Sequence, residues 1–208
     1  MSDPRPALLV ATSNRHKLAE FARLLPPGLR LVDLGDVGVS LPEETGETFA
    51  ENARLKALAA STAGYLTIAD DSGLEVATLA GAPGVRSARY AGEPGDDARN
   101  RTALLAALRD TPPEARQARF VCAVVLARDG QILAESEGTC FGRIAPDPRG
   151  QHGFGYDPLF LLPDSRTVAE LSPAEKDRVS HRGQAVRAIM PALEAALRDE
   201  ARTHERGR

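Results

Sequence analysis

Short apolar runs typical of buried strands alternate along this chain with segments whose apolar residues recur at helical spacing. The run at 7–11 leads into a segment with apolar residues at every third or fourth position, Leu18, Phe21, Ala22 and Leu25. A second run at 65–69 follows a helical segment that opens with the capping-box pair Thr48 and Glu51. Because helices and strands interleave in this way, we expect the α/β class with a mixed sheet.

The middle of the chain changes from helical spacing to the pattern of an antiparallel ribbon. Two β-rich runs, 120–127 and 132–137, flank the Asp-Gly dipeptide at 129–130, which favours a hairpin turn. A third strand is expected at 138–144 and a short one at 159–162. The sheet is therefore expected to contain antiparallel as well as parallel strands.

Three further helices are expected in the remaining segments. They are placed at 97–109, after Ser172 with a capping glutamate three residues on, and from Ser180 to about Arg198. The last of these helices contains Pro191, where we expect it to bend or break, because proline lacks the N–H group of a helical hydrogen bond.

Length and composition bound the classes of protein to which the chain can belong. With 208 residues, 42% of them hydrophobic, we expect a single domain over 1–198 and a charged, disordered tail over 199–208. No apolar stretch approaches the roughly 20 residues of a membrane helix, and the N-terminal residues lack a secretory signal. A net charge of -3 argues against a nucleic-acid polymer as partner. We therefore expect a cytoplasmic protein whose two cysteines, Cys122 and Cys140, are packing residues.

Lysine is rare in this chain. Of the 26 basic residues only three are lysine, namely Lys17, Lys56 and Lys176. Since arginine supplies the ordinary surface charge, a position that keeps lysine is a candidate for a role that needs a compact ammonium group. Chance placement is the alternative, but each lysine lies within a polar motif.

The first polar motif is the turn between the first expected strand and helix. It contains Thr12, Ser13, Asn14, Arg15, His16 and Lys17. A helix start offers unpaired N–H groups and a partial positive charge, so this turn is a candidate phosphate site. A plain helix cap with an exposed lysine would leave the same pattern.

The second motif combines acidic residues from two parts of the chain. Asp70 and Asp71 end an apolar run and begin an expected turn, and Glu43 and Glu44 lie upstream. Carboxylates suit a hard cation such as Mg²⁺, and a carboxylate beside the cation could orient or deprotonate water. Solvated aspartates in an Asx turn are the alternative.

The third motif lies in a glycine-rich loop and contains Gly153, Phe154, Gly155, Tyr156 and Asp157. Glycines let the backbone approach a ligand closely, the two aromatic rings could stack on a flat base, and the aspartate offers a polar edge. Core packing of the two rings is the alternative.

The fourth motif joins Lys176 with His181 and Arg182 at another helix start. The lysine could meet phosphate, and the other two side chains could donate to a carbonyl oxygen on a base. His181 could instead be an ordinary surface histidine, and transition-metal ligation is not expected because no further ligand stands at suitable spacing. No nucleophile motif supports covalent acyl chemistry.

Together and in this order, the four motifs resemble the inosine triphosphate pyrophosphatase family. The matching stretches are VATSNRHKLAEF, LPEETGETFAENARLKA, IADDSGLEVATLAGAPGVRSARYAG, GFGYDPLF and AELSPAEKDRVSHRGQA. The resemblance implies an elongated α/β fold in which a mixed sheet divides two lobes around a central cleft. It also implies a homodimer that depends on Mg²⁺ and hydrolyses ITP, dITP and XTP to the monophosphate and pyrophosphate, which removes these nucleotides from the pool.

The resemblance assigns roles residue by residue. It implies triphosphate binding at 12–17, metal carboxylates at Glu43 and Asp71, and a catalytic proton acceptor at Asp71. It implies nucleotide contacts at a further set of residues, namely Ser72, Phe154, Gly155, Tyr156, Asp157, Lys176, His181 and Arg182. Ser13 and His16 stand where the family usually has glycines.

The resulting hypothesis is that Glu43 and the pair Asp70 and Asp71 hold Mg²⁺ against the phosphates while the three lysines spread positive charge around them. Asp71 would orient water for attack at the α-phosphorus. Donors facing position six of the purine would favour inosine and xanthosine over adenosine. Two alternatives stay open: a non-catalytic purine-nucleotide-binding regulator, and a phosphatase that releases orthophosphate.

Overall fold

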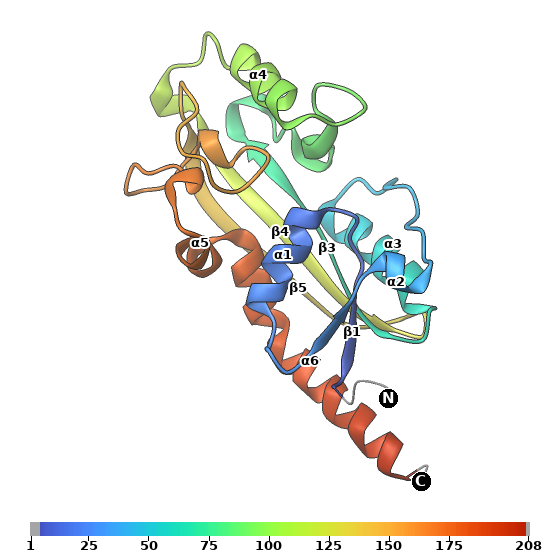
Figure 1. Cartoon of the computed structure of the whole chain (residues 1–208). Coiled ribbons are helices and arrows are strands. Elements are labelled where there is room, and N and C mark those ends of the chain that lie inside the picture. Colours follow the sequence, from blue (N-terminus) through green and yellow to red (C-terminus); the bar gives the residue numbers. More distant parts are fainter. Residues whose placement is uncertain (1–4, 207–208) are drawn as a thin grey trace. The chain divides into compact units, whose positions relative to one another are not determined.

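The computed structural model describes residues 5–206, which form a six-stranded mixed sheet and six α-helices (Figure 1). The strands are β1 (Ala7–Val10), β2 (Arg30–Val32), β3 (Leu66–Val76), β4 (Gln117–Arg128), β5 (Gln131–Ile144) and β6 (Phe160–Leu161). The helices are α1 (Arg15–Leu24), α2 (Leu34–Val37), α3 (Phe49–Ser61), α4 (Asp97–Ala107), α5 (Pro173–Val179) and α6 (His181–Arg206). In the strand order β2-β1-β3-β4-β5-β6, β1 pairs in parallel with β2 and β3, and β5 pairs antiparallel with β6. The predicted α/β class with a mixed sheet is confirmed.

The chain divides into two compact units, each discontinuous in sequence. One unit contains the chain up to Asp71, the segment Ala123–Glu137 and the chain from Ala185 onward. The other contains Ser72–Cys122 and Gly138–Gln184. Strands β3, β4 and β5 each contribute residues to both units. Within residues 5–206, no helix is long and apolar enough to span a membrane.

The first unit is built on the β1 strand and on helices that are capped as the sequence predicted. Leu8, Leu9 and Val10 of β1 are fully buried, as continuous apolar runs in parallel strands usually are. Helix α3 begins with the Thr48 and Glu51 capping box, in which each side chain accepts a hydrogen bond from the other residue's backbone N–H. The box fixes where α3 starts, and α3 carries Asn52 and Lys56 into the interior.

The second unit has an apolar core of its own. The buried side chains of this core include residues from β3, α4, β4, β5, β6 and the loops after them: Leu74, Val76, Leu104, Leu108, Phe120, Cys140, Ile144, Tyr156, Leu159, Phe160 and Leu162. Within this core, Phe120 and Phe160 stack with ring centroids 4.4 Å apart. Ser172 and Glu175 form the predicted capping box at the start of α5.

The central ribbon forms as predicted, with one simplification. Asp129 and Gly130 connect β4 to β5, with φ angles of 51° and 73°. Positive φ at both central residues is the geometry that favours an Asp-Gly hairpin. The strands expected at 132–137 and 138–144 are one continuous strand, β5.

Two predicted boundaries are wrong. The turn expected at 70–73 does not form, because β3 continues from Leu66 to Val76. Helix α6 passes through Pro191 and reaches Arg206, so the residues expected to form a disordered tail are helical as far as that point. Glu200, Ala201 and Arg202 are good helix formers, and Glu200 pairs with Arg128 at 3.1 Å. Residues 207–208 lie outside the described residues.

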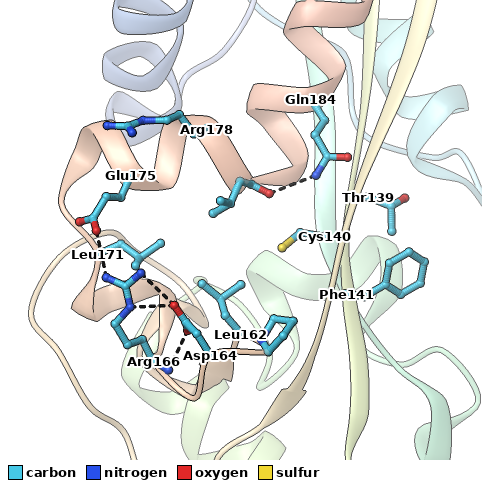
Figure 2. A pocket seen from close by; sticks show the side chains of 12 residues that line it. Thr139, Cys140, Phe141, Leu162, Asp164, Arg166, Leu171, Glu175, Arg178 and Gln184 are labelled. Carbon is cyan, nitrogen blue, oxygen red and sulfur yellow. Dashed lines mark hydrogen bonds and ion pairs between the residues drawn. The ribbon is translucent and has the colours of Figure 1, made fainter.

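A cavity of about 630 Å³ lies in the second unit (Figure 2). Its wall includes the Cys140 thiol and apolar side chains of Leu162 and Leu171. On its polar side, Arg166 pairs with Asp164 and with Glu175. None of the residues predicted to bind nucleotide or metal lines this cavity.

The two cysteines are expected to be unreactive in the folded protein. Neither Cys122 nor Cys140 forms a disulfide, and both are buried. Burial together with the negative charge of Asp157 raises the pKa of Cys140 to about 11. Because the thiolate is the reactive form, alkylation of Cys140 should rise about tenfold per pH unit between pH 7 and 10. Mass spectrometry after timed iodoacetamide treatment would follow each cysteine. Rapid labelling of Cys140 at pH 7 would contradict this expectation, and complete labelling in denaturant is the control.

Candidate functional site

Some of the predicted site residues lie in two clusters, one in each unit, and the first cluster also contains Glu44 and Asn52. The first cluster contains Lys17, Glu44, Asn52, Lys56, Asp70 and Asp71. The second cluster contains Ser72, Phe154, Asp157, Lys176 and Arg182. Each cluster is held by contacts within its own unit.

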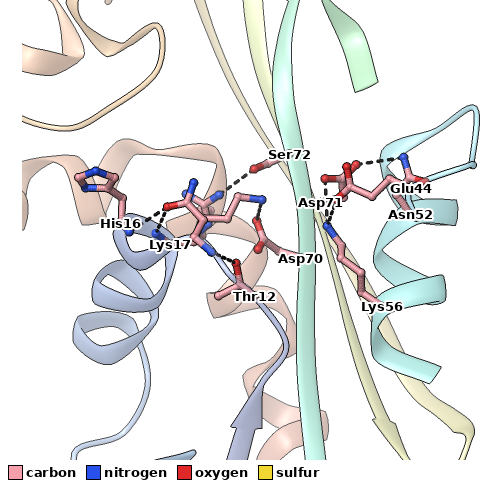
Figure 3. A network of polar contacts seen from close by, with 11 residues as sticks. Thr12, His16, Lys17, Glu44, Asn52, Lys56, Asp70, Asp71 and Ser72 are labelled. Atoms are coloured by element: carbon pink, nitrogen blue, oxygen red, sulfur yellow. Dashed lines mark hydrogen bonds and ion pairs between the residues drawn. The ribbon is translucent and has the colours of Figure 1, made fainter. Parts of the chain in front are cut away.

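The predicted phosphate turn is a capped helix start. Asn14 is the N-cap of α1, and its side-chain oxygen accepts from the N–H groups of His16 at 2.8 Å and Lys17 at 3.2 Å. The Asn14 N–H in turn donates to the hydroxyl of Thr12 at 3.2 Å. The turn therefore has the geometry of a helix cap. The cap places Lys17 on the first turn of α1 (Figure 3).

Strand β3 places Asp70 and Asp71 on opposite faces (Figure 3). Successive side chains of a strand alternate in direction, so the two carboxylates cannot act as one pair on one side. Asp70 lies 3.1 Å from the ammonium group of Lys17, and Asp71 lies 3.2 Å from that of Lys56. The expectation that the two aspartates jointly hold one cation is therefore corrected by the continuation of β3 through them.

Asp71 lies at the centre of the first cluster and is only 5% exposed. Its Oδ1 faces Lys56, and its Oδ2 accepts a hydrogen bond from Asn52 at 3.3 Å. Lys56 also donates to Glu44 at 2.7 Å. One buried ammonium group thus lies between two carboxylates from different parts of the chain.

Asn52 forms hydrogen bonds both to Gly46, in the loop after Glu43 and Glu44, and to Asp71. The sequence did not reveal this role. Its oxygen accepts from the Gly46 N–H at 2.8 Å, and its amide nitrogen donates to the Gly46 carbonyl at 3.3 Å as well as to Asp71. A Cβ at Gly46 would approach the Asn52 oxygen to 2.8 Å, so the close approach requires glycine. The i,i+4 spacing of Asn52 and Lys56 was the available clue, because it places both on one face of α3.

Charge and burial shift both central pKa values. Burial raises the pKa of the Asp71 carboxyl above its ordinary value, against the opposing charges of Lys56 and Lys17. Burial acts to lower the pKa of Lys56, but the surrounding carboxylates outweigh it and the pKa is raised. Lys56 is therefore held as a cation, and Asp71 is a stronger base than an exposed aspartate.

The acidic pair upstream contributes through Glu44. Glu44 is half-buried and contacts Lys56, whereas Glu43, the residue predicted as a metal ligand, is exposed. Among the described residues, no group of three or more histidine, cysteine or acidic side chains is arranged to hold a metal ion. The carboxylate oxygens that face Lys56 are nevertheless the donor type that Mg²⁺ prefers, and Mg²⁺ is usually bound by one or two carboxylates with substrate phosphates. The donor chemistry of this cluster thus fits Mg²⁺.

The second cluster is organised by Asp157. Its Oδ2 accepts from the Phe154 N–H at 2.9 Å and from the Lys176 ammonium at 2.6 Å. Gly153 has a φ of 78°, and a Cβ there would meet the same oxygen at 2.0 Å, so only glycine fits this turn. Asp157 and Lys176 are 3% and 5% exposed, and they form a buried ion pair beneath the loop.

Two cations face the ring of Phe154. The Lys176 ammonium lies 4.7 Å and the Arg182 guanidinium 5.9 Å from its centroid. Arg182 is 1% exposed and donates to the Ser72 hydroxyl at 2.7 Å. The loop thus places an aromatic ring beside two cationic hydrogen-bond donors.

Tyr156 and His181 lie in the interior. Tyr156 is 4% exposed and belongs to the apolar core, and its hydroxyl donates to the Ser87 carbonyl at 2.9 Å. Burial raises the pKa of Tyr156. His181 is 7% exposed and stacks on Phe120 with centroids 4.8 Å apart. Tyr156 therefore offers no stacking face for a base, and His181 is not a surface histidine.

The chain is thus an α/β protein with two polar clusters. One cluster pairs carboxylates with ammonium groups, and the other places two cations beside an aromatic ring. The Ham1 family model matches residues 8–192. This chain therefore belongs to the Ham1 family.

Relatives of known name support the assignment. A protein of Mycolicibacterium paratuberculosis named dITP/XTP pyrophosphatase is 54% identical over 201 residues, which cover 92% of this chain and 97% of the relative. A protein of the same name from Mycobacterium tuberculosis is 54% identical over 195 residues, covering 89% and 94%. The pyrophosphatase family predicted from the sequence motifs is confirmed.

Solved structures agree with the fold. A HAM1 protein from Coxiella burnetii matches with a TM-score of 0.82 at 41% identity. The Staphylococcus aureus Ham1 protein matches with a TM-score of 0.80 at 39% identity, and each match covers 91% of this chain and 99% of the other. The α/β fold of this chain is thus the fold of Ham1 proteins.

Proposed function

We propose that this chain hydrolyses dITP, XTP and ITP to the nucleoside monophosphate and pyrophosphate. The observation that carries the proposal is the buried Asp71 carboxylate beside the Lys56 ammonium, with Glu44 on the same cation. The names of relatives that are 54% identical support the substrate class. The chain would thereby remove non-standard purine nucleotides from the nucleotide pool.

The first cluster supplies the chemistry at phosphorus. Asp71, whose pKa is raised by burial, would accept a proton from the attacking water and orient it. Lys17 and Lys56 would offset the charge of the triphosphate, which matters because phosphoryl transfer depends on positioning and charge stabilisation. Glu43, Glu44 and Asp71 would hold Mg²⁺, which supplies neutralisation of phosphate oxygens when bound.

The second cluster supplies the choice of base. Phe154 offers a stacking surface, and the donors of Lys176 and Arg182 face it. Inosine and xanthosine carry a carbonyl acceptor at position six, whereas adenosine carries an amino donor. A buried donor left facing another donor costs about 1–3 kcal/mol, so two such mismatches would give a strong preference.

A substrate panel with product identification tests the proposal. With Mg²⁺ present, ITP, dITP and XTP are expected to give pyrophosphate, detected by ³¹P NMR, and ATP is expected to react at least about tenfold more slowly. Orthophosphate as the first product would indicate a phosphatase, and tight nucleotide binding without turnover would indicate a regulator. Equal rates with ITP and ATP would overturn the proposed selectivity.

Two further features are proposed. They are a homodimeric state, which the family resemblance implies, and the cytoplasmic location expected from the sequence. Light scattering coupled to gel filtration would test the first, with a monomer as the contradicting result.

A further inference from the structure

Helix α4 binds both backbone polar groups of Gly155, in the glycine-rich loop at 153–157. The Gly155 N–H donates to Asp97 Oδ2 at 2.6 Å, and the Gly155 carbonyl accepts from Arg101 Nη1 at 2.8 Å. Asp97 and Arg101 are four residues apart, so they lie on one face of α4. Both polar groups of a single loop residue are thus held by one helix.

We call these two hydrogen bonds to Gly155 the clamp. Gly155 directly follows Phe154, so the clamp holds the backbone next to the residue that carries the aromatic ring. Gly155 has a φ of 60°, a conformation that glycine adopts readily. On the other side, the Phe154 N–H donates to Asp157. The backbone is therefore fixed immediately before and immediately after the Phe154 side chain.

Helix α4 is itself anchored to a second loop of the same unit. Asn100, which is 2% exposed, donates to the Ala88 carbonyl at 3.0 Å and accepts from the Ala91 N–H at 2.8 Å. The neighbouring Ser87 accepts a hydrogen bond from the Leu74 N–H of β3 at 2.9 Å. These hydrogen bonds connect β3 to α4 through the segment 87–91, so α4 is held in place where it binds the loop.

We propose that Asp97 and Arg101 are positioning residues that set where the Phe154 ring lies against Lys176 and Arg182, and thereby set the preference for the purine base. The proposal rests on the proposed function and deepens it. When the clamp is lost, the loop that carries Phe154 must become ordered as the base binds. This ordering costs free energy and weakens binding of the base. Chemistry at phosphorus depends on the first cluster and not on this clamp.

The test compares Arg101→Met and Asp97→Asn with the unchanged protein. Both variants are expected to raise KM for ITP about tenfold, leave kcat within about threefold, and reduce the ITP-to-ATP ratio of kcat/KM about tenfold. Because both side chains hold the same residue, the double variant should be little worse than the more affected single variant. Arg99→Met, on the same helix but bound to the Pro94 carbonyl, is the matched control and should change none of these values.

A second readout does not depend on turnover. Hydrogen exchange measured on the peptide that contains 153–157 should be faster in both clamp variants, while exchange of β3 stays unchanged. Equal loss of kcat with ITP and ATP, or an unchanged KM with faster loop exchange, would overturn the proposal. If the unchanged protein released no pyrophosphate from ITP, the proposed function would fail by itself, whatever the exchange result.

Discussion

Replacing Asp71 with asparagine is expected to lower kcat for ITP by about two orders of magnitude or more, with a smaller effect on KM. Asparagine keeps the shape of the side chain and one oxygen for Lys56, but it cannot accept a proton. The raised pKa of the buried Asp71 carboxyl is what makes it a good acceptor, so the loss falls on the chemical step. Steady-state kinetics with pyrophosphate detection measure the change.

The same variant separates catalysis from folding. Lys56 keeps its contact with Glu44 in Asp71→Asn, and burial already disfavours the charged form of Asp71. The thermal midpoint should therefore change little while activity is lost. Asp129→Asn makes the same chemical change in the β4–β5 turn, where asparagine is equally suited, and should leave kcat unaltered. Near-normal turnover of Asp71→Asn would remove Asp71 from the role of proton acceptor.

Local rules predicted much of the fold because they involve residues close in sequence. Two predicted capping boxes and the Asp-Gly hairpin form where the sequence placed them. The continuation of β3 beyond Ala69 to Val76 could not be predicted in this way. Two consecutive aspartates favour a turn unless each finds a partner, and here Lys17 and Lys56 supply those partners from helices that lie elsewhere in the sequence.

The rarity of lysine pointed to the site, but not to its arrangement. Each of the three lysines contacts an aspartate: Lys17 with Asp70, Lys56 with Asp71 and Lys176 with Asp157. Sequence reasoning assigned all three to phosphate, because a lysine within a polar motif gives no sign of which carboxylate will face it. The interior position of Tyr156 was equally hidden, since a glycine-flanked aromatic residue has the same sequence pattern in a loop as in a core.

Replacing Lys56 with methionine is expected to destabilise the folded protein by about 3 kcal/mol, because removing one partner of a buried ion pair leaves the other uncompensated. Lys56 is 5% exposed, and its ammonium lies between Asp71 and Glu44. Methionine fills similar space, so the loss reports charge more than packing. Urea unfolding at pH 7 measures the change, and an unaltered midpoint would contradict the assignment.

A second substitution in that background tests the cause of the loss. Adding Asp71→Asn to Lys56→Met removes one of the two uncompensated carboxylates. The double variant should therefore be more stable than Lys56→Met alone. Activity should not recover, because the proton acceptor and the cation are then both absent. Lys56→Arg keeps the charge and should retain most of the stability, but its planar fork cannot place one compact cation between two carboxylates, so kcat should still fall. A double variant less stable than Lys56→Met would show that Lys56 stabilises the unit by packing and not by its charge.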